Sequence, residues 1–245
     1  MEKEKLVINT LVFLYDLKNR VPQSTIIDKV NKLGIKSVEV RREFIKDFNK
    51  EILDIKEKAS SYNMNLFYSV PEWLFRGNKL RRKEIEIYFN EANNMNCHNV
   101  KMNIGEVNEL SVEDVKAIDE LCKKYEIKLT IENDQTYENG RSKKIYNFLK
   151  KDRELGGNIS LTFDVANWIF QDEDPIKNSE LLKDFVKYIH LKNADVNRKN
   201  TLLDEGILNL EKILHNLPKN LPMALEYPCT SIEEVELEIK KALKL

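Results

Sequence analysis

Eight short runs of strand-forming residues recur along this chain about every 31 residues, and this regular spacing constrains the fold more than any other feature. Each run is rich in Val, Ile, Leu, Phe or Tyr and is followed by polar or turn-forming residues. The runs are residues 5–13, 37–42, 65–70, 99–104, 128–133, 159–164, 186–192 and 222–227. Because each interval has room for one strand and one helix, the spacing predicts repeated strand–helix units and a parallel sheet.

The segments between the runs carry helix signals. Ser24 and Gly34 bracket one amphipathic stretch as an N-cap and a C′ glycine would. Ser111 and Ser231 each precede an acidic residue by three positions, which predicts capping-box starts for two more helices. Eight units in 245 residues favour a single closed (β/α)₈ TIM barrel over an open two-sided sheet. No linker-like segment divides the chain, so we expect residues 1–245 to form one domain.

The composition narrows the functional class. Hydrophobic residues make up 42% of the chain, enough for a sizeable core, and the formal net charge is −1. No stretch is uniformly basic, so the electrostatic footprint of a nucleic-acid-binding protein is absent. No apolar run approaches the roughly 18 residues of a membrane span, and the three cysteines form no CxxC motif. We therefore predict a cytoplasmic protein with reduced thiols that binds neither nucleic acid nor membrane.

Four residues that can bind a metal ion stand at the tail ends of the last four runs. They are Glu132, Asp164, His190 and Glu226, separated by 32, 26 and 36 residues. In a (β/α)₈ barrel the carboxyl ends of all strands face one bowl, so these four side chains should converge. Three carboxylates and one imidazole suit a single divalent ion, namely Mn²⁺, Mg²⁺, Co²⁺ or Zn²⁺. Four protein ligands leave about two positions on an octahedral ion for adjacent substrate oxygens.

Other polar residues have two possible interpretations. Any one of the four strand-end residues, taken singly, is more simply a solvated residue or a helix N-cap, and only their joint order favours a metal site. Glu39 and Arg41 alternate along one run and therefore share a face. If that face points inward they form a charged network at the rim, and if it points outward they are solvated. The sequence leaves this choice open.

The motifs around the four strand-end residues resemble those of the xylose isomerase-like barrels. Within that superfamily the similarity is to sugar epimerases and isomerases, such as the ketohexose 3-epimerases. The matching stretches are IEN around Glu132, FDVAN around Asp164, YIHLKNA around His190 and ALEYP around Glu226. The turn DEG at 204–206 also resembles one that follows strand seven in the family. Each motif is short, but their order and spacing are fairly specific, and the resemblance covers most of the chain.

The resemblance implies a divalent-metal-dependent isomerase or epimerase that acts on a small carbohydrate, either a sugar or a sugar phosphate. In those enzymes the metal is held by Glu, Asp, His and Glu after strands five to eight. The metal makes the C–H bond beside a carbonyl acidic as an enediolate forms. By analogy Glu132 and Glu226 are the catalytic residues, one taking a proton and the other returning one. Family members often dimerise, so a homodimer is possible.

The same resemblance implies four substrate-binding positions, at Glu138, Asn167, Lys192 and Arg198. Lys192 stands two residues after His190, as in the family's HxK run. The epimerases have a histidine where this chain has Asn167, and they commonly follow the HxK run with an aspartate where this chain has Asn193. These two departures leave the identity of the substrate open.

Three other functions share this pattern. A metal-dependent keto-cyclitol dehydratase, which is a lyase, would use the same site and the same enolisation. An apurinic-site endonuclease of the superfamily builds a three-metal cluster from several histidines. This chain has only three histidines, and His98 and His215 lie away from the strand ends. A non-catalytic sugar or metal sensor is the remaining alternative.

Overall fold

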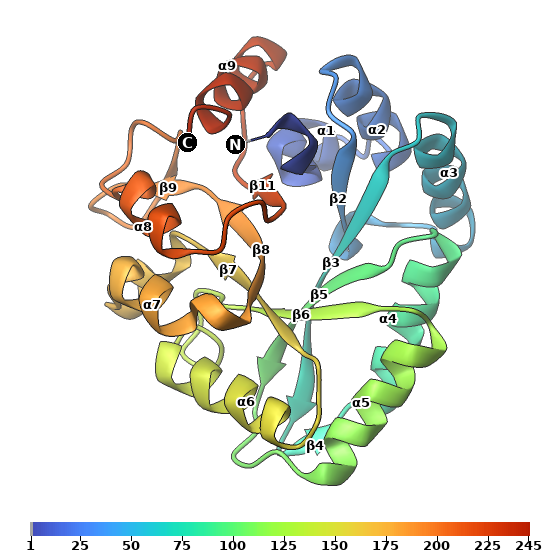
Figure 1. Cartoon of the computed structure of the whole chain (residues 1–245). Coiled ribbons are helices and arrows are strands. Elements are labelled where there is room, and N and C mark those ends of the chain that lie inside the picture. The colour runs from blue at the N-terminus through green and yellow to red at the C-terminus, as the bar shows by residue number, and fades with distance from the viewer. Residues whose placement is uncertain (1) are drawn as a thin grey trace.

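Eight parallel strands close into a barrel in the computed structural model, which describes residues 2–245. Neighbouring strands are hydrogen-bonded in the order β2-β1-β11-β8-β7-β6-β5-β3, and pairing of β2 with β3 closes the ring (Figure 1). The strands are β1 (Leu6–Asn9), β2 (Ser37–Arg41), β3 (Asn65–Arg76), β5 (Asn99–Gly105), β6 (Lys128–Glu132), β7 (Ser160–Asp164), β8 (Val186–Leu191) and β11 (Met223–Leu225). The predicted (β/α)₈ TIM barrel is therefore confirmed, and each expected run coincides with one barrel strand, although β3 extends to Arg76, beyond the run 65–70.

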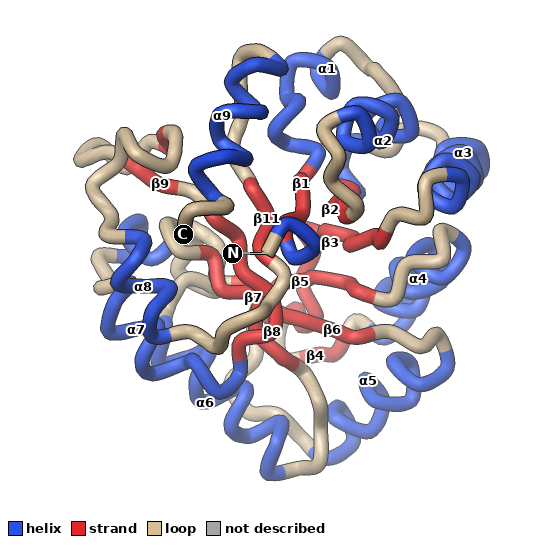
Figure 2. The backbone as a smooth tube through the Cα atoms, turned by 45° about the horizontal axis from the view of Figure 1, so that its top comes forward, coloured by secondary structure: helices blue, strands red, loops and turns tan. Residues whose placement is uncertain are grey.

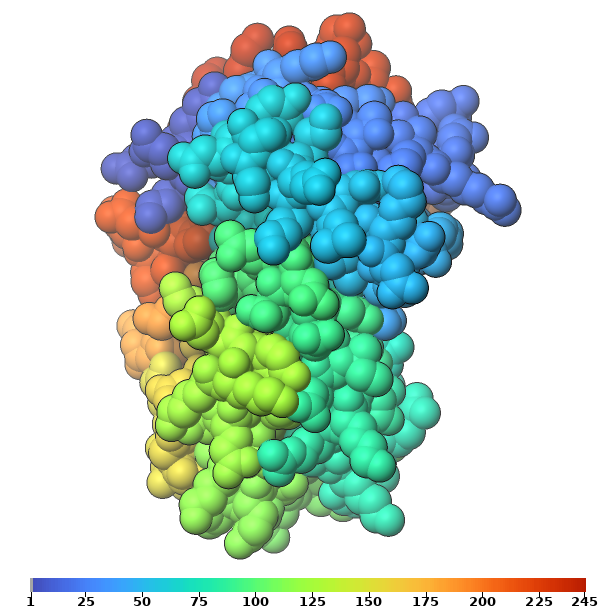
Figure 3. Space-filling model, turned by 90° about the vertical axis from the view of Figure 1, so that its right-hand side faces the viewer, coloured from blue at the N-terminus to red at the C-terminus, as the bar shows by residue number. Residues whose placement is uncertain are grey.

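Helices run between consecutive barrel strands and cover the outside of the sheet (Figure 2). They are α1 (Leu14–Lys18), α2 (Gln23–Lys32), α3 (Phe48–Ser61), α4 (Arg82–Asn94), α5 (Val112–Lys124), α6 (Ser142–Glu154), α7 (Pro175–Leu182), α8 (Leu210–Asn216) and α9 (Ile232–Ala242). Figure 3 shows one outer side of the molecule, where the segments coloured from blue to green form a continuous layer. Within residues 2–245, none of the helices combines the length and apolar character that crossing a bilayer requires.

Short elements decorate the barrel rims. Strand β4 (Lys79–Leu80) folds back antiparallel on the extended end of β3. Strands β9 (Asn193–Ala194) and β10 (Asn200–Thr201) form a two-stranded antiparallel ribbon after β8. The 3₁₀ turns are η1 (Lys3–Lys5), η2 (Thr10–Phe13), η3 (Arg42–Phe44), η4 (Asn167–Gln171) and η5 (Lys183–Phe185). Of these, η4 begins three residues after the end of β7 and so lies near the carboxyl ends of the barrel strands.

The predicted helix caps were right at Gly34, Ser111 and Ser231 and wrong at Ser24, and Gly34 follows the C-cap residue of α2 with a φ of +71°. Ser111 and Asp114 form a full capping box on α5, and Ser231 caps α9 by accepting from the amide of Glu234. Helix α2 begins at Gln23, so Ser24 lies inside the helix and is not its N-cap. The side chain of Gln23 is used elsewhere, because its Oε1 accepts hydrogen bonds from the Thr10 hydroxyl and from a backbone amide of β2.

The barrel interior has an apolar layer below a charged one. Val7, Phe67, Tyr188 and Ala224 pack together as a cluster separate from the main core, with the Phe67 and Tyr188 rings stacked 4.6 Å apart. The main core lies between the strands and the helices, where outward-facing strand residues meet the apolar helix faces. Toward the carboxyl ends of the strands the inward positions become polar, and Glu39 is fully buried there. The functional residues therefore stand above an apolar base.

Candidate metal centre

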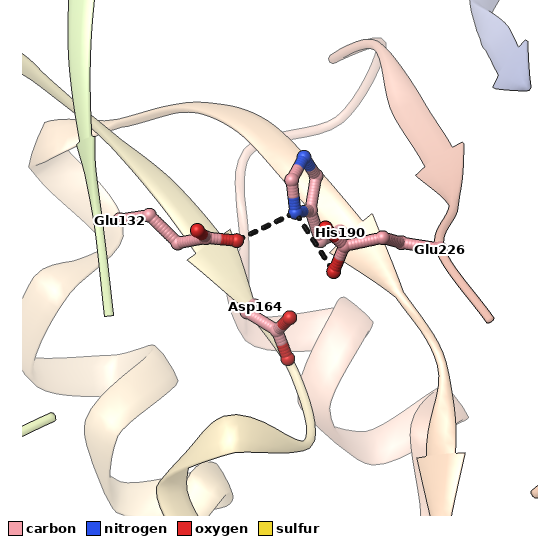
Figure 4. Close-up of side chains that lie close together, drawn as sticks. All are labelled: Glu132, Asp164, His190 and Glu226. Carbon is pink, nitrogen blue, oxygen red and sulfur yellow. Dashed lines mark ion pairs between the residues drawn. The ribbon is translucent and has the colours of Figure 1, made fainter. Parts of the chain in front are cut away.

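Glu132, Asp164, His190 and Glu226 meet at the carboxyl ends of four consecutive barrel strands (Figure 4). Glu132 and Asp164 end β6 and β7, His190 lies near the end of β8, and Glu226 follows β11. One potential ligand atom from each lies within 4.8 Å of the others. We call these four residues the quartet. No member is more than 5% exposed, so the cluster is desolvated rather than a surface coincidence.

In two of the quartet's carboxylates, one oxygen is held by another group of the protein. Oε2 of Glu132 lies 2.5 Å from the ammonium of Lys101 on β5. Oδ1 of Asp164 accepts hydrogen bonds from the backbone amides of Ala166 and Asn167, each at 2.9 Å. The opposite oxygen in each case, Oε1 of Glu132 and Oδ2 of Asp164, is left to face the interior of the cluster. Each side chain is thus oriented by one atom and offers the other.

The imidazole of His190 is held in the same way by Glu39 on β2. Its Nε2 lies 3.0 Å from Oε2 of that carboxylate. Asn9 and the hydroxyl of Tyr188 donate hydrogen bonds to the same oxygen, at 2.7 and 3.1 Å. With Nε2 turned to Glu39, Nδ1 of His190 faces the cluster, 2.7 Å from Oε1 of Glu132. A carboxylate behind a ligand histidine is the usual device for fixing the ring orientation in a metal site.

Glu226 is contacted by two cations. Nη1 of Arg41 lies 2.7 Å from Oε1 of Glu226. The ammonium of Lys192, two residues after His190, lies 3.0 Å from Oε2 of Glu226 and 2.6 Å from Oδ2 of Asp164. Glu39 and Arg41 therefore share the inward face of β2, which resolves the choice that the sequence left open.

The donor set fits a divalent cation. Oε1 of Glu132, Oδ2 of Asp164 and Nδ1 of His190 are all buried, and none makes a directed hydrogen bond to any part of residues 2–245. Oε1 of Glu132 and Nδ1 of His190 lie 2.7 Å apart, and Oδ2 of Asp164 lies 2.6 Å from the Lys192 ammonium, so the three atoms point into one small region that a cation could occupy. Oxygen donors with one imidazole nitrogen match Mn²⁺, Mg²⁺, Co²⁺ or Zn²⁺. The cluster could therefore bind a metal ion.

The surroundings shift the pKa values of Glu132 and Asp164 in opposite directions. Burial raises the pKa of Glu132, but the Lys101 ammonium and His190 outweigh it and hold the pKa at about 2. Burial raises the pKa of Asp164 to about 7, against the opposing pull of Lys192. Glu132 is thus held ionised by its neighbours, whereas Asp164 depends more on a nearby positive charge.

The remaining predicted residues lie at different distances from this centre. Lys192 is part of it. Asn167 borders it, donating its backbone amide to Asp164 and its side-chain Nδ2 to the carbonyl of Asn133. The structure does not bring Glu138 or Arg198 into contact with the quartet. Their roles in substrate binding stay predictions.

Glu138 and Arg198 have other surroundings. Glu138 lines a groove beside α6, and its backbone carbonyl accepts a hydrogen bond from Lys144. Arg198 is exposed in the turn between β9 and β10 and pairs with Asp172 just after η4. Both side chains stand near the rim rather than at the centre.

Lys101 and Asn133 are contributors to the centre that the sequence reasoning missed. The Asn133 side chain both donates to the backbone carbonyl of Asp164 and accepts from its amide, at 2.9 Å each, so it fixes the end of β7. A usable signal was present for Lys101, because Asn99, Lys101 and Asn103 alternate with apolar residues along β5. That alternation places a lysine on the inward face of a barrel strand.

The comparisons with known proteins agree with the barrel fold. The family model of the xylose isomerase-like TIM barrel matches residues 27–245. No curated protein matches the chain in sequence.

Several solved structures share the fold over nearly the whole chain. A xylose isomerase domain-containing protein from Salmonella typhimurium LT2 superposes with a TM-score of 0.74 at 14% identity, covering 100% of this chain and 97% of that one. A D-psicose 3-epimerase, solved in the presence of D-fructose, gives 0.71 at 14% identity, covering 98% and 96%. A "probable 3-DHS dehydratase" of petrobactin synthesis in Bacillus anthracis gives 0.67 at 13% identity, covering 97% and 98%. At these identities the likeness establishes the fold alone.

Proposed function

We propose that this chain, which belongs to the family of xylose isomerase-like TIM barrels, is a divalent-metal-dependent sugar isomerase or epimerase. The observation that carries the proposal is the quartet, in which each residue is anchored by one atom and presents another to a common point. A carbohydrate whose carbonyl and neighbouring hydroxyl approach that point would meet carboxylates on two sides. The D-psicose 3-epimerase among the structural neighbours supports this reading.

Glu132 and Glu226 are the proposed acid–base pair. A cation held by the quartet supplies the Lewis acidity that makes the C–H bond beside a carbonyl labile. Glu132 and Glu226 belong to β6 and to the end of β11, which lie on opposite sides of β7 and β8 in the barrel. One carboxylate takes the α proton as an enediolate develops, and the other returns a proton to the reacting carbon.

The surrounding cations keep this pair in place during proton transfer. Lys101 holds the outer oxygen of Glu132, and Arg41 holds the outer oxygen of Glu226. These contacts orient each carboxylate, and the oxygen that does not bind the ion would exchange the proton with the substrate. Burial of the quartet excludes bulk water, which strengthens these interactions and protects the enediolate.

A keto-cyclitol dehydratase is the second candidate, and two observations favour keeping it. The fold matches a protein described as a probable 3-DHS dehydratase. The Lys192 ammonium inside the site could also protonate a departing hydroxyl at the β carbon. An endonuclease gains no support, because His98 bonds the backbone of Glu126 and His215 is exposed on α8. Only His190 lies in the cluster.

The deciding experiment combines metal content with α-proton exchange. We expect about one divalent ion per chain, and NMR in D₂O should detect exchange of the α proton in one member of a panel of ketoses, ketose phosphates and keto-cyclitols. Glu132→Gln and Glu226→Gln should both lose exchange. Glu86→Gln is the matched control, because Glu86 lies on the outside of α4 and pairs with Lys124.

Each alternative has its own outcome. Exchange together with a new ultraviolet absorbance from an unsaturated product would assign the lyase instead. No metal after loading with Mn²⁺ would rule out both reactions. The expected cytoplasmic location and homodimer stay predictions.

A further inference from the structure

Lys192 differs from the other two cations of the site in which oxygens it contacts. Lys101 and Arg41 contact the outer oxygens, Oε2 of Glu132 and Oε1 of Glu226. The Lys192 ammonium contacts the inner ones, at 2.6 Å from Oδ2 of Asp164 and 3.0 Å from Oε2 of Glu226. These inner oxygens belong to the donor set that would hold a metal ion. Of these three cations, Lys192 is therefore the one that contacts the inner oxygens.

The burial of Lys192 strengthens its contacts with these carboxylate oxygens. The residue is 4% exposed and follows β8 directly, so its ammonium is paired with carboxylates in a desolvated site. Oδ2 of Asp164 makes no directed hydrogen bond within residues 2–245, and Lys192 is the only cation paired with it there. An ammonium and a divalent ion cannot both sit against the same two oxygens, because two positive charges a few ångströms apart repel strongly in a buried site.

The charge balance of the buried site agrees with this. Four carboxylates, those of the quartet and Glu39, face three basic side chains, Lys101, Lys192 and Arg41, together with the imidazole of His190. The site is therefore nearly neutral without any added ion. A divalent cation that entered while every side chain stayed in place would create a buried positive excess, which is costly.

We propose that Lys192 is an internal counter-cation that holds Asp164 and Glu226 until a divalent ion displaces its ammonium. This inference rests on the metal site of the proposed function and goes beyond it. Metal affinity is then set by competition between the ion and a tethered ammonium, and is lower than the four donors alone would give. Without metal, Lys192 keeps the carboxylates from being buried unpaired.

Metal binding at one fixed pH tests this directly. We would titrate Mn²⁺ into wild type, Lys192→Met and Lys192→Gln, following free Mn²⁺ by electron paramagnetic resonance. Removing the competing charge should tighten Mn²⁺ binding by about tenfold or more in both variants. Lys187→Met is the matched control, because Lys187 is an exposed lysine on the same strand, and its affinity should equal that of wild type.

A stability measurement protects the test against a variant that folds poorly. Loss of Lys192 leaves buried carboxylates unpaired, so the metal-free variants should unfold at lower temperature than wild type. Saturating Mn²⁺ should then raise their unfolding temperature by more than it raises that of wild type. Unchanged or weaker Mn²⁺ affinity in folded Lys192→Gln would overturn the competition and assign Lys192 to positioning the carboxylates. Absence of Mn²⁺ binding in every variant would overturn the metal centre itself.

Discussion

At the scale of single residues, the centre depends on side chains in which one polar atom is held by the protein and another faces the cluster. His190 shows this most clearly, because Nε2 is turned to Glu39 and only Nδ1 remains for a ligand. The carboxylate of Glu39 is itself held by Asn9 and Tyr188. The ring orientation is thus determined by a residue outside the quartet.

Glu39→Gln should weaken metal binding without removing a ligand. The amide cannot stabilise the Nε2–H donor as a carboxylate does, so the imidazole loses both orientation and basicity. We expect Mn²⁺ affinity to fall about 10- to 100-fold, measured by titration calorimetry. Glu91→Gln serves as the control, because Glu91 is a buried carboxylate that pairs with Arg42 outside the metal centre. Equal losses in both variants would mean that a general defect in folding explains the result.

The sequence allowed the donors to be predicted but not their partners. Glu132 or Glu226 can be recognised because strand ends of a barrel share one bowl, so position alone indicates convergence. The partner of each outer oxygen depends on side-chain conformation and strand register. Lys101 reaches a neighbouring strand and Arg41 reaches across β1 to β11. Short sequence motifs do not encode such distant pairings.

At the scale of elements, the last turn of α6 carries a buried carboxylate, that of Asp152, whose pKa is raised. Oδ2 of Asp152 accepts a hydrogen bond from the amide of Ile159 at 2.9 Å, while Oδ1 is buried without a partner in residues 2–245. Burial raises the pKa of Asp152 to about 6, and Asp119 adds to the effect. The Asp152 carboxyl group therefore binds its proton more tightly in the folded protein than in the unfolded chain.

The sign of the resulting pH dependence follows from that difference. The stabilising contribution of Asp152 is complete at acidic pH and is lost as the pH rises through about 6. Between pH 5 and 8 wild type should lose about 1.5 kcal/mol more of its free energy of unfolding than Asp152→Asn, which keeps an acceptor for Ile159 but does not titrate. Urea unfolding at the two pH values measures this. Parallel pH profiles would show that the buried carboxylate does not titrate in this range.

Element boundaries were predictable where local chemistry decides them. Ser111 caps α5 through its own backbone neighbours, so Ser111→Ala should lower the free energy of unfolding by about 1 kcal/mol, which urea unfolding measures. No change in the free energy of unfolding would indicate that water replaces the cap.

Ser24 was assigned wrongly because α2 starts earlier, at Gln23, whose side chain bonds to η2 and β2. Such tertiary contacts override a local cap signal.

At the scale of the whole molecule, the four candidate ligands come from four strands and meet only when the barrel is closed. A bound ion should therefore stabilise the folded state and leave the unfolded chain unaffected. Mn²⁺ at about 100 times its dissociation constant should add about 2.7 kcal/mol, which raises the unfolding temperature of a chain of this length by about 5 °C. Differential scanning calorimetry with and without Mn²⁺ measures the shift, and a chelator should reverse it.

Asp164→Asn provides the matched control for that measurement. The asparagine oxygen can still accept from the amides of Ala166 and Asn167, whereas an NH₂ group replaces the oxygen that faces the cluster. The variant should fold but show no Mn²⁺-dependent shift. A shift as large as that of wild type would place the ion elsewhere on the protein.

The first four and the last four barrel strands have different roles in the anchoring contacts. All four donors belong to the last four barrel strands, whereas Asn9, Glu39, Arg41 and Lys101, which hold them, belong to the first four. A fragment beginning at β6 would carry every ligand and still lack the alignment of most of them. Conversely, mutations confined to the first half can retune the chemistry without altering any donor. Directed evolution of this scaffold should therefore find new activities as readily in β1–β5 as around the ligands themselves.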